Sequence, residues 1–210
     1  MMEIIPAILT DDPVELDRLL LLVKNIGATR VHIDILDNTL VAGRTISGWE
    51  QLENKNIWLD IDVHFMTSHP IGDASKWAGV QNVSRMIAHI ESDDPFSEFA
   101  KEMRMRRIEP WIGINLETDY LKLDQYIAQA NGVLCLTVYP GEQGRAFLPD
   151  ACNKIKEFHN AHPNIQIMAD GGVNKETISH CRDAGATHAV CGSAIIKSQN
   201  PKETYLELLK

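Results

Sequence analysis

The sequence is short of positive charge. It has 20 lysines and arginines against 29 aspartates and glutamates, which gives a formal net charge of −9 at pH 7. Nucleic acids and anionic membranes attract clustered basic residues, so this balance argues against either one as the main partner. An anionic small molecule would have to be held by groups close to it.

The sequence also lacks targeting segments, long apolar runs and closely paired cysteines. The N-terminal stretch MMEIIPAILTDD has no basic segment before an apolar run and nothing long enough to span a membrane. The four cysteines show no CxxC spacing and lie in apolar or amphipathic stretches, which is typical of packed free thiols in a reducing cytosol. We therefore expect a cytoplasmic protein.

What the sequence does contain is a regular alternation of two patterns. Short apolar runs rich in β-branched residues predict strands at Ile4–Leu9, Arg30–Ile35, Trp58–Phe65, Val83–His89, Trp111–Asn115, Val133–Thr137, Ile165–Ala169 and Ala189–Cys191. Amphipathic stretches predict helices at Val14–Asn25, Pro95–Met105, Tyr120–Ala128, Pro149–His159, Lys175–Ala184 and Pro201–Leu209. This alternation predicts parallel strands joined by right-handed crossovers.

The number of strands favours a closed barrel. Eight strand–helix units make a complete (β/α)₈ or TIM barrel, and 210 residues lie near the lower size limit for that fold. An open doubly wound sheet is the alternative, but the glycine-rich dinucleotide fingerprint is missing after the first strand, where the sequence continues from Pro6–Leu9 into Thr10–Asp12. We predict one TIM-barrel domain over residues 1–210.

Polar residues occur at the ends of the predicted strands, where barrel enzymes place their active sites. The second strand carries His32 and Asp34 at a spacing of two, so both point to one face. His64 lies near the end of the third strand, and Asp170 follows the seventh. Because alternate residues of a barrel strand point inwards, we expect these four side chains to converge at the barrel mouth.

Two imidazoles and two carboxylates are a ligand set suited to Zn²⁺, Mn²⁺ or Fe²⁺. Such a metal would polarise a carbonyl, and two carboxylates on opposite sides of a sugar could exchange its protons. The alternative for each residue alone is a capping or hydrogen-bonding role. His89 and Glu91 at the end of the fourth strand either support the ligands or only satisfy a strand end. The first reading is favoured because this strand also opens into the mouth.

Glycine-rich turns follow the last three predicted strands. They are Pro140–Arg145, Gly171–Asn174 and Gly192–Ala194. Backbone N–H groups at turns before helices bind phosphate, and barrels commonly place a phosphate site after their late strands. Glycine also serves ordinary tight turns, so it is the clustering of the three segments that indicates a phosphate site.

These motifs resemble the ribulose-phosphate 3-epimerase family over nearly the whole length of the chain. The most specific matches are Val31–Asp37, Asp62–Met66, Leu136–Gly141 with Gly144, and Asp170–Asn174. Relatives on the same barrel that decarboxylate or condense sugar phosphates carry an Asp-x-Lys-x-x-Asp motif. The corresponding segment His32–Asp37 has no lysine, so that activity is disfavoured.

The resemblance implies a metal-dependent epimerase that inverts C3 of D-ribulose 5-phosphate or a close analogue. Its implied divalent-metal ligands are His32, Asp34, His64 and Asp170, and Asp34 and Asp170 are implied to be the acid/base pair. The implied substrate-binding residues are Met66, beside the enediolate, and Gly141, Gly144, Gly172, Gly192 and Ser193, around the phosphate. The implied partners are a phosphorylated ketose and further copies of the same chain.

The sequence departs from the family pattern at several substrate positions. Ala7 stands where the family has a serine that contacts substrate, and Tyr139 replaces a residue that is usually polar. A carboxylate at Glu142 would repel phosphate unless it points outwards or is balanced by Arg145. These changes bear on the sugar more than on the reaction. The alternatives are another phosphorylated ketose, such as a hexulose 6-phosphate, and a catalytically silent sugar-phosphate binder.

Overall fold

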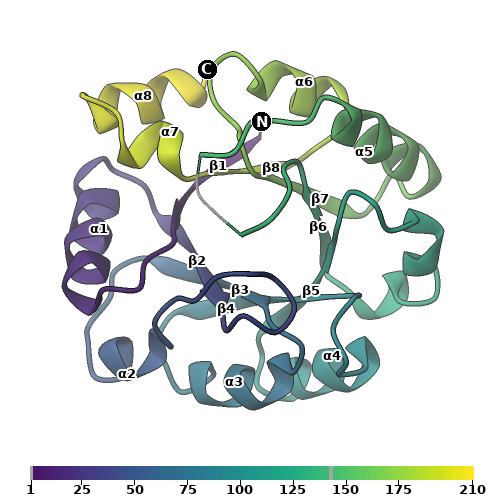
Figure 1. The fold of residues 1–210 in the computed structure, drawn as a ribbon, viewed down its shortest axis with the longest axis horizontal. Helices are drawn as coiled ribbons and strands as arrows, with labels where there is room; N and C mark the ends of the chain where they lie inside the picture. Colours follow the sequence, from purple (N-terminus) through teal and green to yellow (C-terminus); the bar gives the residue numbers. More distant parts are fainter. Residues whose placement is uncertain (1, 142–143) are drawn as a thin grey trace.

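The eight strands close into a parallel barrel in sequence order, as the alternation predicted. The computed structural model describes residues 2–141 and 144–210. Each strand pairs in parallel with its neighbours along the chain, and the first also pairs with the last. Figure 1 looks into the resulting ring of strands. The strands are β1 Glu3–Ile8, β2 Arg30–Leu36, β3 Asp60–Met66, β4 Val83–His89, β5 Glu109–Ile114, β6 Gly132–Leu136, β7 Gln166–Asp170 and β8 His188–Cys191.

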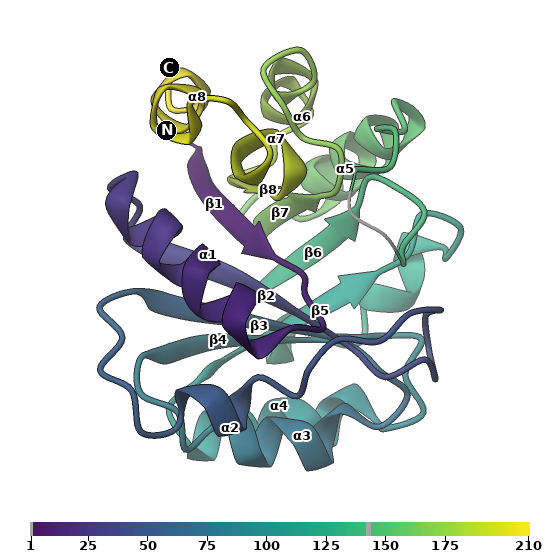
Figure 2. The same cartoon turned by 60° about the vertical axis from the view of Figure 1, so that its left-hand side comes forward.

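Helices surround the barrel on the outside, as both views show (Figures 1 and 2). They are α1 Pro13–Asn25, α2 Trp49–Leu52, α3 Pro70–Trp77, α4 Phe96–Met105, α5 Asp150–Ala161, α6 Ile178–Asp183, α7 Ser193–Ile196 and α8 Pro201–Leu208. None of the helices in the described part of the chain combines the length and apolar character needed to cross a membrane.

Helix α1 illustrates how local sequence sets these elements. The Asp12 carboxylate accepts a hydrogen bond of 2.8 Å from the Val14 N–H and so caps the first turn, while Pro13 occupies a first-turn position where no N–H is needed. The buried residues of the helix recur at helical spacing; they are Leu16, Leu19, Leu20 and Val23.

The prediction of a helix at Tyr120–Ala128 is wrong. The structure has two short 3₁₀ turns instead, at Tyr120–Leu123 and Ile127–Gln129. Within the first turn only Leu123 is buried, and Leu121 is 57% exposed, so the segment has no continuous apolar face to pack on the barrel. Helices α2, α3 and α7 were not predicted from the sequence.

The core has two main parts, and Leu36, Val41 and Met66 form a third, small cluster. A large cluster fills the space between the outer face of the sheet and the helices. A smaller one fills the inside of the barrel; its members are Ile5, Ala7, Ile87, Trp111, Leu134, Leu136, Met168 and Val190. The barrel is therefore a packed core rather than a pore, and a ligand can enter only at its ends.

Charged residues close the amino end of the barrel. Asp62, which is fully buried, accepts a 2.6 Å hydrogen bond from Arg30 and lies 3.5 Å from the Arg85 guanidinium. Glu3 of β1 lies 3.2 Å from His188 of β8, across the junction that closes the ring. These ion pairs occupy the amino end, so the carboxyl ends of the strands remain as the open face.

Candidate active site

Four polar side chains meet at the carboxyl ends of three strands. His32 and Asp34 come from β2, His64 from β3 and Asp170 from β7. The β2–β3 register places Asp34 directly beside His64. All four residues are buried, and one potential ligand atom from each lies within 4.8 Å of the others. The structure thus brings together the four residues that the strand alternation predicted to converge.

The spacing of these atoms suits a metal ion. Asp34 Oδ1 lies 3.2 Å from His32 Nε2 and 3.0 Å from His64 Nδ1. Asp170 Oδ2 lies 3.4 Å from His64 Nδ1 and 4.0 Å from His32 Nε2. Four ligands held about 2.1 Å from a tetrahedral ion are about 3.4 Å apart, which matches these separations.

His32 gives an independent indication. Its Nε2 lies 3.2 Å from Asp34 Oδ1 but not in hydrogen-bond geometry, its Nδ1 has no hydrogen-bond partner among the residues that the structure describes, and the side chain is fully buried. Buried polar atoms without hydrogen bonds are rare in native proteins, and a site for a bound ion is one of the recognised reasons for them. The donor set therefore fits a divalent metal held by His32 Nε2, Asp34, His64 Nδ1 and Asp170.

The electrostatics of the group agree with this fit. Burial favours the neutral form of Asp34, but the His32 and His64 imidazoles outweigh burial and hold the pKa of its carboxyl well below the usual range. Burial likewise disfavours charge on His64, yet Asp170 and Asp34 raise its pKa to about 9. Both shifts show that the two carboxylates attract positive charge to the space between them.

His89 and Glu91 lie behind His64, as the sequence analysis favoured. His89 Nε2 lies 2.8 Å from His64 Nε2, and His89 Nδ1 lies 3.0 Å from a Glu91 oxygen. Burial lowers the pKa of His89. Burial would raise the pKa of Glu91, but hydrogen bonds from His89 and from the Asn115 N–H bring it down to about 2.

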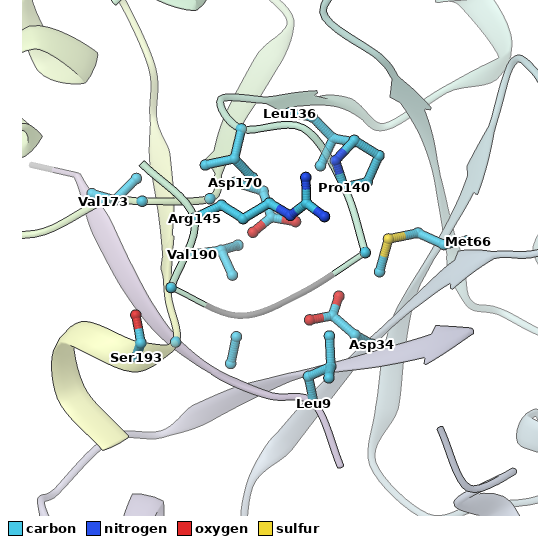
Figure 3. A pocket seen from close by; sticks show the side chains of 17 residues that line it. Leu9, Asp34, Met66, Leu136, Pro140, Arg145, Asp170, Val173, Val190 and Ser193 are labelled. Atoms are coloured by element: carbon cyan, nitrogen blue, oxygen red, sulfur yellow. The ribbon is translucent and has the colours of Figure 1, made fainter. Parts of the chain in front are cut away.

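A pocket opens directly above this group. Figure 3 shows Asp34 and Asp170 pointing toward one another across it, with Met66 on one side and Ser193 on the other. The lining residues include every substrate-binding residue that the family resemblance implied: Met66, Gly141, Gly144, Gly172, Gly192 and Ser193. His32 and His64 are not part of the lining, since both are fully buried beneath it.

Glycine is required on the side of the pocket near β7. Gly172 has a φ of +65°, in the left-handed region, and a Cβ there would come within 2.8 Å of the Phe147 backbone nitrogen. Any larger residue would have to displace the loop after β6. The turn after β7 therefore stays close to that loop because residue 172 has no side chain.

Arg145 lines the pocket, although the sequence did not single it out as a substrate-binding residue. It was expected only as the last residue of the glycine-rich turn Pro140–Arg145 and as a countercharge for Glu142, which lies outside the described residues. In the structure Arg145 lines the pocket, and it is the one lysine or arginine among the described lining residues. Figure 3 shows its guanidinium extending across the mouth near Asp170 and Pro140. Its position next to Gly144 in a glycine-rich turn was the feature of the sequence that could have indicated a place in the pocket.

The fold and the site together define the class of this chain. It is a TIM barrel with a candidate metal group of two histidines and two aspartates at the carboxyl ends of its strands. Comparison with known families is more specific. The chain belongs to the Ribulose-phosphate 3 epimerase family, whose model matches residues 3–196.

Individual relatives agree with this family. The chain is 29% identical to a cytoplasmic isoform of ribulose-phosphate 3-epimerase from Oryza sativa subsp. japonica, over 99% of this chain and 93% of the relative. It is 27% identical to ribulose-phosphate 3-epimerase from Escherichia coli (strain K12), over 87% and 83% of the two chains.

Solved structures support the fold alone. A 3-hexulose-6-phosphate synthase superposes with a TM-score of 0.73 at 16% identity and covers 99% of this chain and 98% of its own. A tryptophan synthase α-subunit from Pyrococcus furiosus gives a TM-score of 0.72 at 17% identity, over 99% and 97% of the two chains.

Proposed function

We propose that this protein is a metal-dependent epimerase that inverts C3 of a phosphorylated ketose, with D-ribulose 5-phosphate as its substrate and D-xylulose 5-phosphate as its product. The observation that carries this proposal is the placement of Asp34 and Asp170. They face one another across the pocket (Figure 3), and both belong to the group suited to a metal. Inversion at carbon needs a proton carrier on each face of the substrate, and this arrangement provides one on each.

Asp34 acts as the base toward one face of C3. Its carboxyl is ionised and lines the pocket, where it can reach the substrate proton. Asp170 returns a proton to the other face, which inverts the configuration, and the reverse reaction exchanges the two roles. His32 and His64, together with the two aspartates, would hold the divalent ion, which when bound would stabilise the negative charge that develops on the substrate oxygens.

The remaining pocket residues hold the substrate in register with the two aspartates. Gly144, Gly172, Gly192 and Ser193 line the part of the pocket where a phosphate would lie, and Arg145 supplies a positive charge beside it. Met66 lines the opposite side, where a thioether can pack against the reacting carbons without competing for their protons.

A hexulose 6-phosphate is the second candidate substrate. Ala7 lines the pocket where the family resemblance leads to a serine, so a hydroxyl is missing and space is gained. Turnover assays with both sugar phosphates distinguish the two candidates.

The test is turnover of D-ribulose 5-phosphate and of a hexulose 6-phosphate by protein loaded with Zn²⁺, Mn²⁺ or Fe²⁺, beside a chelated control. Metal-dependent formation of xylulose 5-phosphate is the expected result. Turnover of the hexulose alone would reassign the substrate. Tight metal and phosphate binding without turnover of any ketose phosphate would contradict the proposal and favour a silent binder.

We also propose that the protein acts in the cytoplasm as a homo-oligomer. All four cysteines are free thiols, which suits a reducing compartment, and the oligomer follows the family resemblance. Sedimentation of the purified chain at micromolar concentration tests the second point; a monomer at all concentrations would contradict it.

A further inference from the structure

A chain of buried hydrogen bonds runs from His64 away from the pocket. His64 Nδ1 faces Asp34 and Asp170, while its Nε2 lies 2.8 Å from Nε2 of His89, the last residue of β4. The planes of the two imidazoles are only 19° apart, and their centroids are 5.0 Å apart. With the two nitrogens this close, the rings meet edge to edge, so one N–H can point at the other's lone pair.

The chain continues to a carboxylate. His89 Nδ1 lies 3.0 Å from Glu91 Oε2, and Glu91 Oε1 accepts a hydrogen bond of 3.0 Å from the Asn115 backbone N–H. His64 and His89 are fully or almost fully buried, so neither ring can exchange these partners for water. Each link needs one donor and one acceptor, and a neutral imidazole has one of each.

The hydrogen bonds from His64 through His89 to Glu91 can be donated in only one direction if His64 Nδ1 is to bind a metal. Glu91 is ionised and accepts, so His89 must carry its proton on Nδ1 and offer a lone pair at Nε2. His64 must then carry its proton on Nε2 and leave a lone pair at Nδ1, which faces the two aspartates. The carboxylate at the far end of the chain therefore determines which nitrogen of His64 is available to a metal.

We propose that His89 and Glu91 are positioning residues that fix His64 in the tautomer and orientation in which Nδ1 binds the divalent metal. This inference rests on the proposed metal site. Hydrogen-bonded partners of this kind orient metal-binding histidines and raise their basicity, and their loss typically costs 10- to 100-fold in metal affinity. Neither residue lines the pocket, so both act through His64 rather than on the substrate.

The surrounding strand makes room for His89. A Cβ on Gly113 of β5 would lie 2.8 Å from His89 Cδ2 and 2.9 Å from its Nε2. The absence of a side chain at residue 113 is therefore what allows the imidazole to reach His64.

The loop after β5, whose Asn115 N–H binds Glu91, is itself held in place by Lys154. The Lys154 ammonium of α5 donates hydrogen bonds to the carbonyls of Asn115, Leu116 and Thr118. These bonds fix the loop after β5, and with it the Asn115 N–H that binds Glu91. The chain from His64 is thus anchored at its far end by a helix outside the barrel.

Metal affinity of matched variants tests the inference without requiring turnover. Zn²⁺ and Mn²⁺ titrations would compare the wild type with His89→Phe, His89→Gln and Glu91→Gln. We expect His89→Phe, which keeps a ring but has no acceptor, to bind metal about 10- to 100-fold more weakly. His89→Gln should remain within a few fold of wild type, because its amide oxygen can replace Nε2 as acceptor. Metal affinity equal to wild type in all variants, or an equal loss of metal affinity in His89→Phe and His89→Gln, would overturn the assignment.

The tautomer itself can be read in the zinc-loaded protein by ¹⁵N–¹H correlation spectra of the histidines. The inference requires His64 to carry its proton on Nε2 and His89 to carry its proton on Nδ1. Circular dichroism of each variant is the control for folding. A His64 proton on Nδ1 would overturn the inference. Correct tautomers in a protein that turns over no ketose phosphate would instead contradict only the proposed function, and a wild type that binds no metal would overturn both.

Discussion

At the scale of single residues, the main feature is that two carboxylates and two imidazoles share one buried space. Asp34 and Asp170 lie within 4.0 Å of both His32 and His64. Unpaired charges are costly to bury, so such a group is stable only when positive charge compensates the carboxylates. The imidazole nitrogens of His32 form no hydrogen bond with the described residues, which supports an ion as part of this compensation.

Asp170→Asn should lower proton exchange at C3 of ribulose 5-phosphate by at least about 100-fold, since it removes a proton carrier with little change in volume. Deuterium uptake from D₂O into the substrate, followed at saturating Mn²⁺, measures this. Asp183→Asn, at an exposed position at the end of α6, is the matched control and should exchange like wild type. Undiminished exchange in Asp170→Asn would exclude Asp170 as the proton carrier.

His32→Ala should lower the metal content of the purified protein well below one ion per chain, because it removes one of four ligands. Elemental analysis after dialysis measures this content. His69→Ala is the control, since His69 has a 72% exposed side chain and pairs with Asp94 outside the pocket. A His32→Ala protein that still carries one ion per chain would show that His32 is not a ligand.

The period-two alternation of the strands was sufficient to predict that His32, Asp34, His64 and Asp170 converge. The position of Arg145 could not be predicted in this way. It depends on the path of the loop after β6 across the mouth, which local spacing does not encode. The sequence favoured a supporting role for His89 and Glu91, but it could not show that His89 contacts His64 in particular, because that contact depends on the register between neighbouring strands.

At the scale of elements, prediction was more successful for the strands than for the helices. Every predicted strand overlaps a strand of the structure, because each contains several buried apolar residues even where polar residues alternate with them. Helices α2 and α7 have only four residues each, too few to show a periodicity. The segment after β5 contains apolar residues at helical spacing, but too few of them are buried to stabilise a helix.

Gly132→Ala tests the packing between β5 and β6. Gly132 pairs with Trp111, and a Cβ at residue 132 would lie 2.5 to 2.6 Å from three indole atoms. The indole cannot move away easily, because it is fully buried between Arg85 and His188. We expect a loss of about 1–3 kcal/mol in unfolding free energy, measured by urea denaturation.

The control for this substitution is Gly72→Ala in α3, where an added Cβ meets nothing within 4 Å. That change should leave stability equal or slightly higher, because alanine is the better helix former. If the two variants were equally stable, the tight fit of the Trp111 indole against β6 would be refuted.

At the scale of the whole molecule, closure of the barrel joins the first strand to the last. Glu3 of β1 and His188 of β8 are paired in register, and their side chains meet at 3.2 Å. The hydrogen bond with His188 lowers the pKa of Glu3 to about 2. An interaction that lowers a carboxyl pKa on folding stabilises the fold above the unfolded pKa, and this stabilisation is lost as the pH falls toward the folded value.

Glu3→Gln should therefore reduce stability at neutral pH and flatten its dependence on pH between about 4.5 and about 2. The measurement is the urea midpoint across this range for the variant and the wild type. Because Glu3 is partly exposed, we expect a modest difference at pH 7 that vanishes below about pH 2. An identical pH dependence in both proteins would show that this pair does not contribute to barrel closure.

The central claim is that the two aspartates exchange the C3 proton of a ketose phosphate on opposite faces. Its most direct test is incubation of Mn²⁺-loaded protein with D-ribulose 5-phosphate in D₂O, followed by NMR of the sugar. We expect xylulose 5-phosphate with deuterium at C3 and none at C1. Deuterium at C1, or an unchanged sugar while metal is bound, would contradict it.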